Sequence, residues 1–175
     1  MAVYETDRRW SDRYIDAIRA IIGPRLLVTA PWELDRKQNT DLMVLTARDM
    51  TIACRVRRPG YASRYGWDVT LRAARDTGAE TELAKVVKGW GDWMFYAHAL
   101  DGDRIGFERW FLLDLHALRV DLTREGVRSA LDMPLRMGRL FKRQGNGDGT
   151  HFVAFDVRDF PLVVLASSVP QDEAA

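Results

Sequence analysis

Two groups of residues in the first third of the chain have the types and spacing that phosphodiester chemistry needs. Asp41 opens the hydrophobic run Leu42-Met43-Val44-Leu45, and Arg55, Arg57 and Arg58 end the run that follows. A carboxylate can hold Mg²⁺, which binds a phosphate and activates a water molecule, and a nearby cation stabilises the charge that develops during hydrolysis. These residue types indicate nucleic-acid chemistry if the fold brings them together.

The elements that must position these residues are two β-strands, predicted at 39–45 and 50–58 as neighbours in one sheet. Side chains alternate across a strand, so Arg55 and Arg57 share a face and Val56 points to the other side. Asp41 stands at the mouth of the first strand. The alternation therefore predicts one acid and two arginines on a common surface.

The rest of the chain reads as a mixture of helices and strands. Apolar residues at three- and four-residue spacing predict helices at 6–22 and 80–90, and Gly23-Pro24 ends the first. A weaker pattern predicts a helix at 116–125. Further strands are predicted at 25–30, 67–71, 92–99, 105–115 and 162–166, and a hairpin joins 139–144 to 150–156 around the glycine-rich 145–149.

Composition bounds the class of protein. The chain has 175 residues and a net charge of +1, which fits one domain over 1–166 with a tail at 167–175. One cysteine excludes a disulfide framework. The charged N-terminus does not match a signal peptide, and no apolar run approaches the roughly 20 residues that span a bilayer. We expect a cytoplasmic protein that does not interact with membranes.

The element order over residues 5–115 resembles that of the PD-(D/E)XK nuclease superfamily. Asp41 matches the acid that opens the second core strand in that family, and Arg55-Val56-Arg57 stands where the family has acid–x–Lys. The resemblance implies an α/β (α+β) fold with a central mixed sheet flanked by helices, a restriction-endonuclease-like core, here with a C-terminal β-hairpin extension. The chain also resembles uncharacterised phage and prophage proteins.

The second acid of that motif is replaced, since an arginine at position 55 cannot bind a metal ion. Arg57 can still supply the cation. Glu82 and Lys85 share a face of the predicted helix and could complete the catalytic set with Asp41 and Arg57. The predicted Mg²⁺ ligands are Asp41, Glu82 and Glu33, and Asp35 is an alternative to Glu33. Each residue also has a plainer interpretation: a Glu82–Lys85 surface ion pair, an acid at a strand start, or a cross-strand pair joining Asp41 to an arginine.

A second basic segment precedes the predicted hairpin. It could follow a DNA backbone together with Arg55, Arg57 and Arg58, or it could protect a strand edge from pairing. Its members are Arg136, Arg139, Lys142 and Arg143. The three histidines, His98, His116 and His151, lack the spacing of metal ligands and are expected on the surface or hydrogen-bonded in the core.

Three classes of function follow from these residues. The first is a Mg²⁺-dependent DNA endonuclease with a rearranged active site, and the second is a catalytically inactive relative that binds DNA. The third is a phage-borne protein-interaction module that modulates host machinery. DNA is the expected partner, and a homodimer or a host protein partner is compatible with the sequence.

Overall fold

The computed structural model describes residues 9–29, 42–44, 50–75, 77–131, 133, 142–145 and 149–169. The chain divides into two compact units, Met1–Met50 with Asp103–Gly106 and Thr51–Gly102 with Phe107–Ala175. In the part of the chain that is described, no helix combines the length and the apolar character needed to cross a bilayer. The α+β fold class predicted from the sequence is confirmed, with a four-stranded mixed sheet as its largest sheet.

The first unit contains helical segments and a two-stranded sheet. Residues 9–12 are helical and are followed by α2 (Ile15–Ile22), in which Ile18 and Ile22 are buried, as the predicted apolar stripe requires. The turn η1 (Gly23–Leu26) leads into β1 (Leu27–Thr29), which pairs antiparallel with β2 (Leu42–Val44). The prediction that β2 lies beside the next strand in one sheet is wrong, because β1 supplies the backbone partner of β2 in a separate two-stranded sheet.

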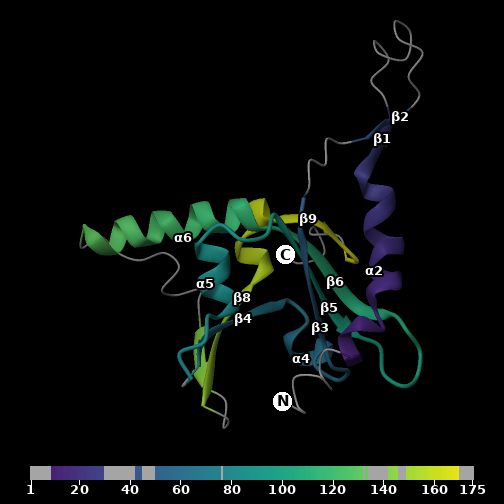
Figure 1. Cartoon of the computed structure of the whole chain (residues 1–175), viewed down its shortest axis with the longest axis horizontal. Helices are drawn as coiled ribbons and strands as arrows, with labels where there is room; N and C mark the ends of the chain where they lie inside the picture. The colour runs from purple at the N-terminus through teal and green to yellow at the C-terminus, as the bar shows by residue number, and fades with distance from the viewer. Residues whose placement is uncertain are drawn as a thin grey trace, which may run out of the picture. The chain divides into compact units, whose positions relative to one another are not determined.

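The four-stranded sheet of the second unit has the order β3-β5-β6-β9 (Figure 1). β3 (Ile52–Arg57) runs parallel to β5 (Trp93–Ala99), and β5 pairs antiparallel with β6 (Phe107–Asp114), as predicted for 92–99 and 105–115. β9 (Val164–Ser167) pairs antiparallel with β6 at the other edge. This sheet therefore has β3 and its arginines on one edge.

Asp92 fixes the start of the parallel pair. Its carboxylate accepts hydrogen bonds from the Thr51 backbone N–H at 2.7 Å and from the Thr51 hydroxyl at 3.0 Å. These bonds favour the ionised form and lower the pKa of Asp92. The contact ties the residue just before β3 to the residue just before β5 and so helps to set their register.

A three-stranded sheet with the order β4-β8-β7 is the second large sheet of this unit. β4 (Asp68–Arg75) is longer than the strand predicted at 67–71, and it pairs antiparallel with β8 (Thr150–Asp156). β8 and β7 (Lys142–Gly145) form the predicted hairpin. The C-terminal hairpin is thus joined to β4 and does not stand as a separate extension.

Helices of the second unit are placed by short local signals. The hydroxyl of Thr81 accepts the backbone N–H of Ala84 at 3.3 Å and caps α5 (Glu82–Val87). Asp114 accepts the N–H groups of His116 and Ala117 at the start of α6 (Leu115–Ala130), which is longer than predicted. α4 (Ala62–Tyr65) is a single turn between β3 and β4.

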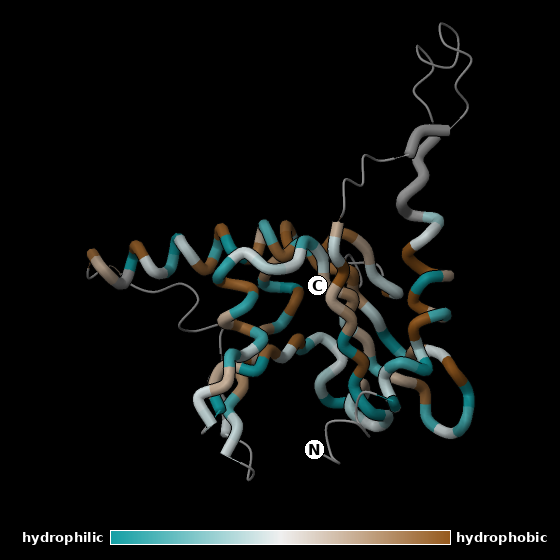
Figure 2. Tube along the Cα trace, viewed as in Figure 1, coloured by the Kyte–Doolittle hydropathy of each residue, from teal (hydrophilic) through white to brown (hydrophobic). Residues whose placement is uncertain are grey.

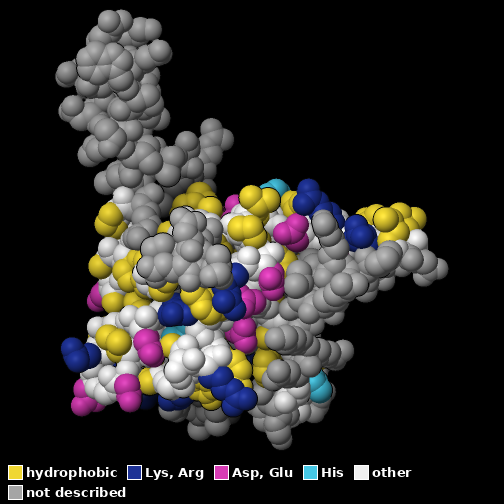
Figure 3. All heavy atoms as spheres, turned by 180° about the vertical axis from the view of Figure 1, so that it is seen from behind, with side chains coloured by type: hydrophobic (Ala, Val, Ile, Leu, Met, Phe, Trp, Pro, Cys, Tyr) yellow, Lys and Arg dark blue, Asp and Glu magenta, His cyan; other side chains and the backbone are white. Residues whose placement is uncertain are grey.

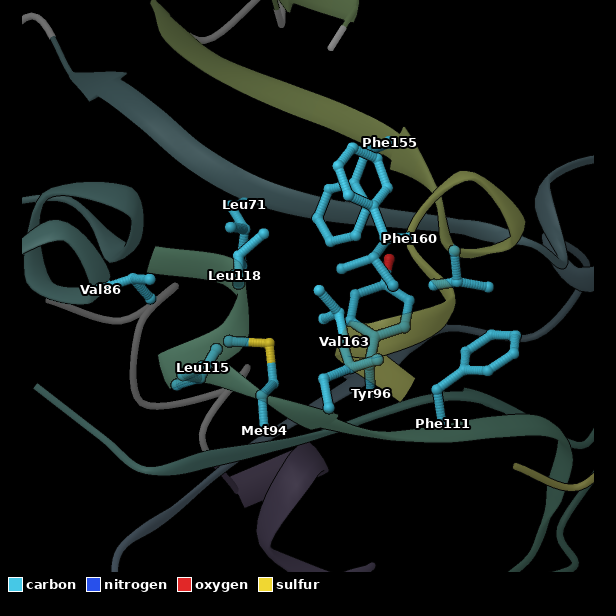
Figure 4. Close-up of a cluster of buried hydrophobic side chains, with 13 residues drawn as sticks. Leu71, Val86, Met94, Tyr96, Phe111, Leu115, Leu118, Phe155, Phe160 and Val163 are labelled. Carbon is cyan, nitrogen blue, oxygen red and sulfur yellow. The ribbon is translucent and has the colours of Figure 1, made fainter. Parts of the chain in front are cut away.

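The hydrophobic core lies where β4, β5, β6, β8 and the helices α5 and α6 converge (Figure 4). Figure 2 shows hydrophobic and hydrophilic residues mixed along the strands and helices of this unit. Its fully buried members include Leu71, Met94, Phe111, Leu118 and Phe155. Burial of such side chains contributes about 1.5–3 kcal/mol each before the entropic cost of folding.

The predicted buried strand at 162–166 is wrong in its first part. Residues 157–163 form the turns η3 (Val157–Asp159) and η4 (Pro161–Val163), and β9 begins only at Val164. Pro161 has no N–H to donate to a ladder and sits at the first position of a turn, where its fixed φ is accommodated. Leu162 is 81% exposed, whereas Val163 is fully buried in the core.

Candidate nucleic-acid interface

The two arginines of β3 face a cavity of about 280 Å³ in the second unit. In the parallel ladder Arg55 lies beside Tyr96 and Arg57 beside His98, so the four side chains share one face, as strand alternation predicts for the arginines. The opposite wall comes from β4 and β8. The full lining is Arg55, Arg57, Tyr61, Tyr65, Asp68, Thr70, Arg72, Tyr96, His98, His151, Phe152 and Ala154.

β4 lies between this cavity and much of the hydrophobic core, and Tyr96 belongs to both the core cluster and the cavity lining. Val69 and Leu71 are fully buried in the core cluster, whereas the alternate residues Asp68, Thr70 and Arg72 line the cavity. Successive side chains of a strand point to opposite faces, so one face of the β4–β8 sheet covers the core and the other bounds the cavity. The cavity is therefore a polar space on the far side of a well-packed layer.

Arg55 is neutralised by Glu82, the first residue of α5. The Arg55 guanidinium forms an ion pair with the Glu82 carboxylate, and the Arg72 backbone N–H donates to the same carboxylate at 3.1 Å. About a quarter of each side chain of the pair is exposed (23% and 27%), so water only partly screens the pair. Glu82 thus pairs with Arg55 and not with Lys85, which is exposed on the same helix.

Arg57 is held by neutral groups. Its Nη1 donates to Thr70 Oγ1 at 3.0 Å, and the Thr70 and Tyr96 hydroxyls share a hydrogen bond of 3.1 Å. The guanidinium also lies over the ring of Tyr61, 5.0 Å from its centroid. Among the residues that the structure describes, no carboxylate forms an ion pair with Arg57. Its charge and several of its five N–H donors are therefore directed at the cavity without a fixed anionic partner.

His98 is the least expected member of the site. It is 1% exposed, and neither ring nitrogen has a hydrogen-bond partner among the described residues. Burial, with smaller contributions from the charges of Arg57 and Arg109, lowers the pKa of His98 to about 4, so the ring is neutral at pH 7. The expectation of a surface or hydrogen-bonded histidine is wrong here, because β5 carries the side chain between two sheets that offer it no partner.

Several predicted residues cannot be placed. Asp41, Glu33, Asp35, Arg136 and Arg139 lie outside the described residues. Lys142 and Arg143 belong to β7, but the structure describes only their backbone. Arg58 is exposed just after β3 and is not part of the cavity lining.

Of the three predicted magnesium ligands, only Glu82 belongs to the described residues, so the predicted site stays a prediction. No group of three His, Cys, Asp or Glu side chains that could hold a metal ion occurs within the described ranges. Glu82, the one predicted ligand that is described, already accepts from Arg55 and from the Arg72 backbone. The Arg55 guanidinium beside this carboxylate places a positive charge where a cation would bind, so we derive no chemical step through a metal ion here.

Charge on the surrounding surface is mixed. On the face shown in Figure 3, basic, acidic and hydrophobic side chains are interspersed. Inside the cavity, by contrast, three arginines and one aspartate line the walls.

The sequence indicated only part of this site. It identified Arg55, Arg57 and Glu82, but not Tyr61, Thr70, Tyr96 or His98. A usable signal was present in β5, where Tyr96 and His98 occupy alternate positions of an otherwise apolar strand. Thr70 gave no such signal, because its partner Arg57 lies 13 positions away in the chain and belongs to a strand of a different sheet.

In comparisons with known proteins, no family model, no curated protein and no solved structure matches this chain. The resemblance to the PD-(D/E)XK superfamily therefore stays a prediction from the sequence.

Proposed function

We propose that this protein binds nucleic acid through its phosphate groups, with Arg57 as the principal contact in the cavity between the β3–β5 and β4–β8 strands. One observation carries the proposal: Arg57 is oriented by Thr70 and Tyr61, and no described carboxylate pairs with it. An arginine held in this way presents a planar fork of donors that matches phosphate oxygens. Tyr61 and Tyr65, on the α4 side, add aromatic surface of the kind on which bases stack.

Binding is better supported than cleavage. The Arg55–Glu82 pair places a guanidinium against the acid that was expected to help hold a metal ion. The same pair keeps Arg55 from competing with Arg57 for a ligand. We therefore assign binding to the cavity and leave Mg²⁺-dependent hydrolysis as a prediction about Asp41 and Glu33.

The test is a comparison of Arg57→Gln with the parent protein in binding to single-stranded and duplex DNA and RNA over a range of salt concentrations. We expect the substitution to weaken binding about tenfold for all sequences and to reduce the salt slope by about one unit, since one phosphate contact is lost. Arg124→Gln is the matched control, because Arg124 is an exposed arginine of α6 paired with Asp121.

Thermal unfolding of both variants shows whether the fold is retained. Binding that is unchanged in a folded Arg57→Gln variant would contradict the assignment of Arg57. A parent protein that binds none of the four nucleic acids at low salt would overturn the proposed function and favour the protein-interaction class.

Cleavage has its own test. Asp41→Asn should abolish any Mg²⁺- or Mn²⁺-dependent cleavage while the protein stays folded, because a neutral amide is a poor replacement for a metal-binding carboxylate of nearly the same shape. The assay is a divalent-metal titration against plasmid, linear duplex, single-stranded and branched DNA. A parent protein that cleaves none of these substrates would contradict the nuclease prediction and leave the binding proposal unaffected.

A further inference from the structure

We infer that the cavity takes a terminal phosphate, the phosphomonoester at the end of a nucleic-acid strand or on a free nucleotide, in preference to a phosphodiester within a strand. The inference rests on the proposed function for the nucleic-acid source of that group. Three observations support it: the depth of the polar lining, the positive charge of Arg57 without a described carboxylate partner, and a buried histidine without a described hydrogen-bond partner.

The polar groups that could recognise a ligand lie deep. Tyr96 and His98 are each 1% exposed, and Thr70 is 7% exposed, yet all three line the cavity. A phosphodiester within a strand is attached to a nucleotide on both sides, and so it must lie along a surface or a through-going groove. A terminal phosphate is attached on one side only and can be inserted between the two walls.

Size agrees with this class of ligand. A cavity of about 280 Å³ is close to the lower end of the roughly 300–1,000 Å³ range of small-molecule sites. That space can hold a phosphate with part of its sugar, whereas it is far too small for a segment of duplex. Tyr61 and Tyr65 also line the cavity and are 42% and 40% exposed, so they are accessible to the base that follows the phosphate.

The charge of the lining favours a dianion. Arg55 is balanced by Glu82, whereas no carboxylate among the described residues forms an ion pair with Arg57. A phosphomonoester carries a charge of about −1.5 to −2 at pH 7, whereas a phosphodiester carries about −1. The larger charge gains more from the same guanidinium group.

His98 provides the third observation. A buried polar group without a partner costs stability, and such groups are rare in folded proteins. His98 lies beside Arg57 in the β3–β5 ladder, so an anion held by Arg57 comes within reach of the imidazole. A neutral imidazole has one N–H to donate to a phosphate oxygen, and this bond would satisfy a nitrogen that the described residues leave without a partner.

The experiment measures binding of one internally labelled single-stranded oligonucleotide with a 5′-phosphate, a 3′-phosphate or only hydroxyl ends. The full chain is used, and an unlabelled nucleoside monophosphate, the matching nucleoside and inorganic phosphate serve as competitors. We expect at least one phosphorylated end to bind about tenfold more tightly than the hydroxyl-ended strand, and the monophosphate to compete while the nucleoside does not.

Variants connect this preference to the cavity. His98→Phe should lower the preference for the phosphorylated end, measured as the ratio of the affinities for the phosphorylated and hydroxyl-ended strands, several-fold. Thr70→Val, which removes the hydroxyl that orients Arg57, should act in the same direction and provides a second variant should the first fold poorly. Arg124→Gln should retain the full preference.

The possible outcomes separate this inference from the proposed function. Equal binding of phosphorylated and hydroxyl-ended strands by the parent protein overturns the inference and leaves nucleic-acid binding standing. Binding of the monophosphate without binding of any oligonucleotide supports the inference and overturns the proposed function. A preference for phosphorylated ends that is unchanged in both folded cavity variants overturns the placement of the site in this cavity.

Discussion

The two faces of the β4–β8 sheet differ in chemistry although their residues alternate along the same strands. Val69 and Leu71 point into a close-packed apolar core, whereas Thr70 and Arg72 point into a polar cavity. On the first face every large side chain has apolar neighbours. The second face bounds the cavity, where Arg57 of β3 has no described carboxylate partner and His98 of β5 has no described hydrogen-bond partner.

This difference separates the residues that stabilise the fold from those that are available to a ligand. The core face gains free energy from burial, and a change there is felt throughout the second unit. The cavity face retains polar groups whose hydrogen-bonding capacity is unused, which costs stability in the ligand-free protein. We therefore expect core substitutions to change mainly the free energy of unfolding and cavity substitutions to change mainly binding.

The largest effect is expected from Leu71→Ala on the core face. Leu71 is fully buried, so the substitution leaves a cavity among well-packed neighbours and should lower the free energy of unfolding by about 3–5 kcal/mol. Denaturant unfolding measures the change. Anion binding should be unchanged under conditions in which the variant is fully folded, and a loss below about 1 kcal/mol would contradict the placement of Leu71 in the core.

The next effect is a pH dependence of stability that comes from His98. Unfolded histidine takes up a proton near pH 6.5, but folded His98 does so only near pH 4, so the folded state is disfavoured as the pH falls through this window. Above pH 6.5 His98 does not reduce the free energy of unfolding by this route. As the pH falls to 4, on the order of 2–3 kcal/mol of the free energy of unfolding is lost. The difference between the unfolding free energies of the parent protein and His98→Phe, measured across this range, should show it.

His98→Phe also removes a buried polar group that has no described partner. At pH 7 the variant should therefore be at least as stable as the parent protein, provided that the ring is accommodated. A parallel pH dependence in the two proteins would mean that His98 is not the titrating group.

A smaller change in stability is expected from Glu82→Gln, which breaks the ion pair with Arg55. The free energy of unfolding should fall by about 1–2 kcal/mol, since the pair is partly buried and the Arg72 backbone N–H also donates to this carboxylate. Binding of a phosphorylated oligonucleotide should become tighter, because Arg55 then adds an uncompensated charge to the cavity. Weaker binding would show that Arg55 must be held by Glu82 for the cavity to keep its shape.

The smallest change in stability is expected from Thr70→Val, at the position next to Leu71 but on the cavity face. Valine has nearly the same shape as threonine, and the loss of the hydroxyl should cost about 1 kcal/mol or less. Binding should still weaken several-fold, because Arg57 loses the acceptor that orients it. A Thr70→Val variant as unstable as Leu71→Ala would remove the distinction between the two faces.

Local patterns predicted much of the secondary structure. The antiparallel pair β5–β6 and the hairpin β7–β8 were predicted because each joins strands that are close in sequence around turn-forming residues. The helix α5 was predicted from its apolar spacing, and the N-cap hydroxyl of Thr81 explains why it begins later than the pattern alone suggested. Strand partners that are distant in sequence, such as β4 with β8, were not predicted, because such a choice depends on what the whole chain can bury.

The sequence by itself determined which side chains share a face. Period-two alternation is a property of the extended backbone, so Arg55 and Arg57 had to lie on one side of β3 wherever that strand was placed. Only the tertiary structure decided that they have different roles. The β3–β5 ladder and the packing of α5 beside β4 bring Glu82 to Arg55 and Thr70 to Arg57, and these contacts join residues 27 and 13 positions apart in the chain. Alternation is local, whereas the partner of a charged side chain is set by the segments that fold against it. This is why Arg55 is neutralised by Glu82, whereas Arg57 faces the same cavity without a described carboxylate partner.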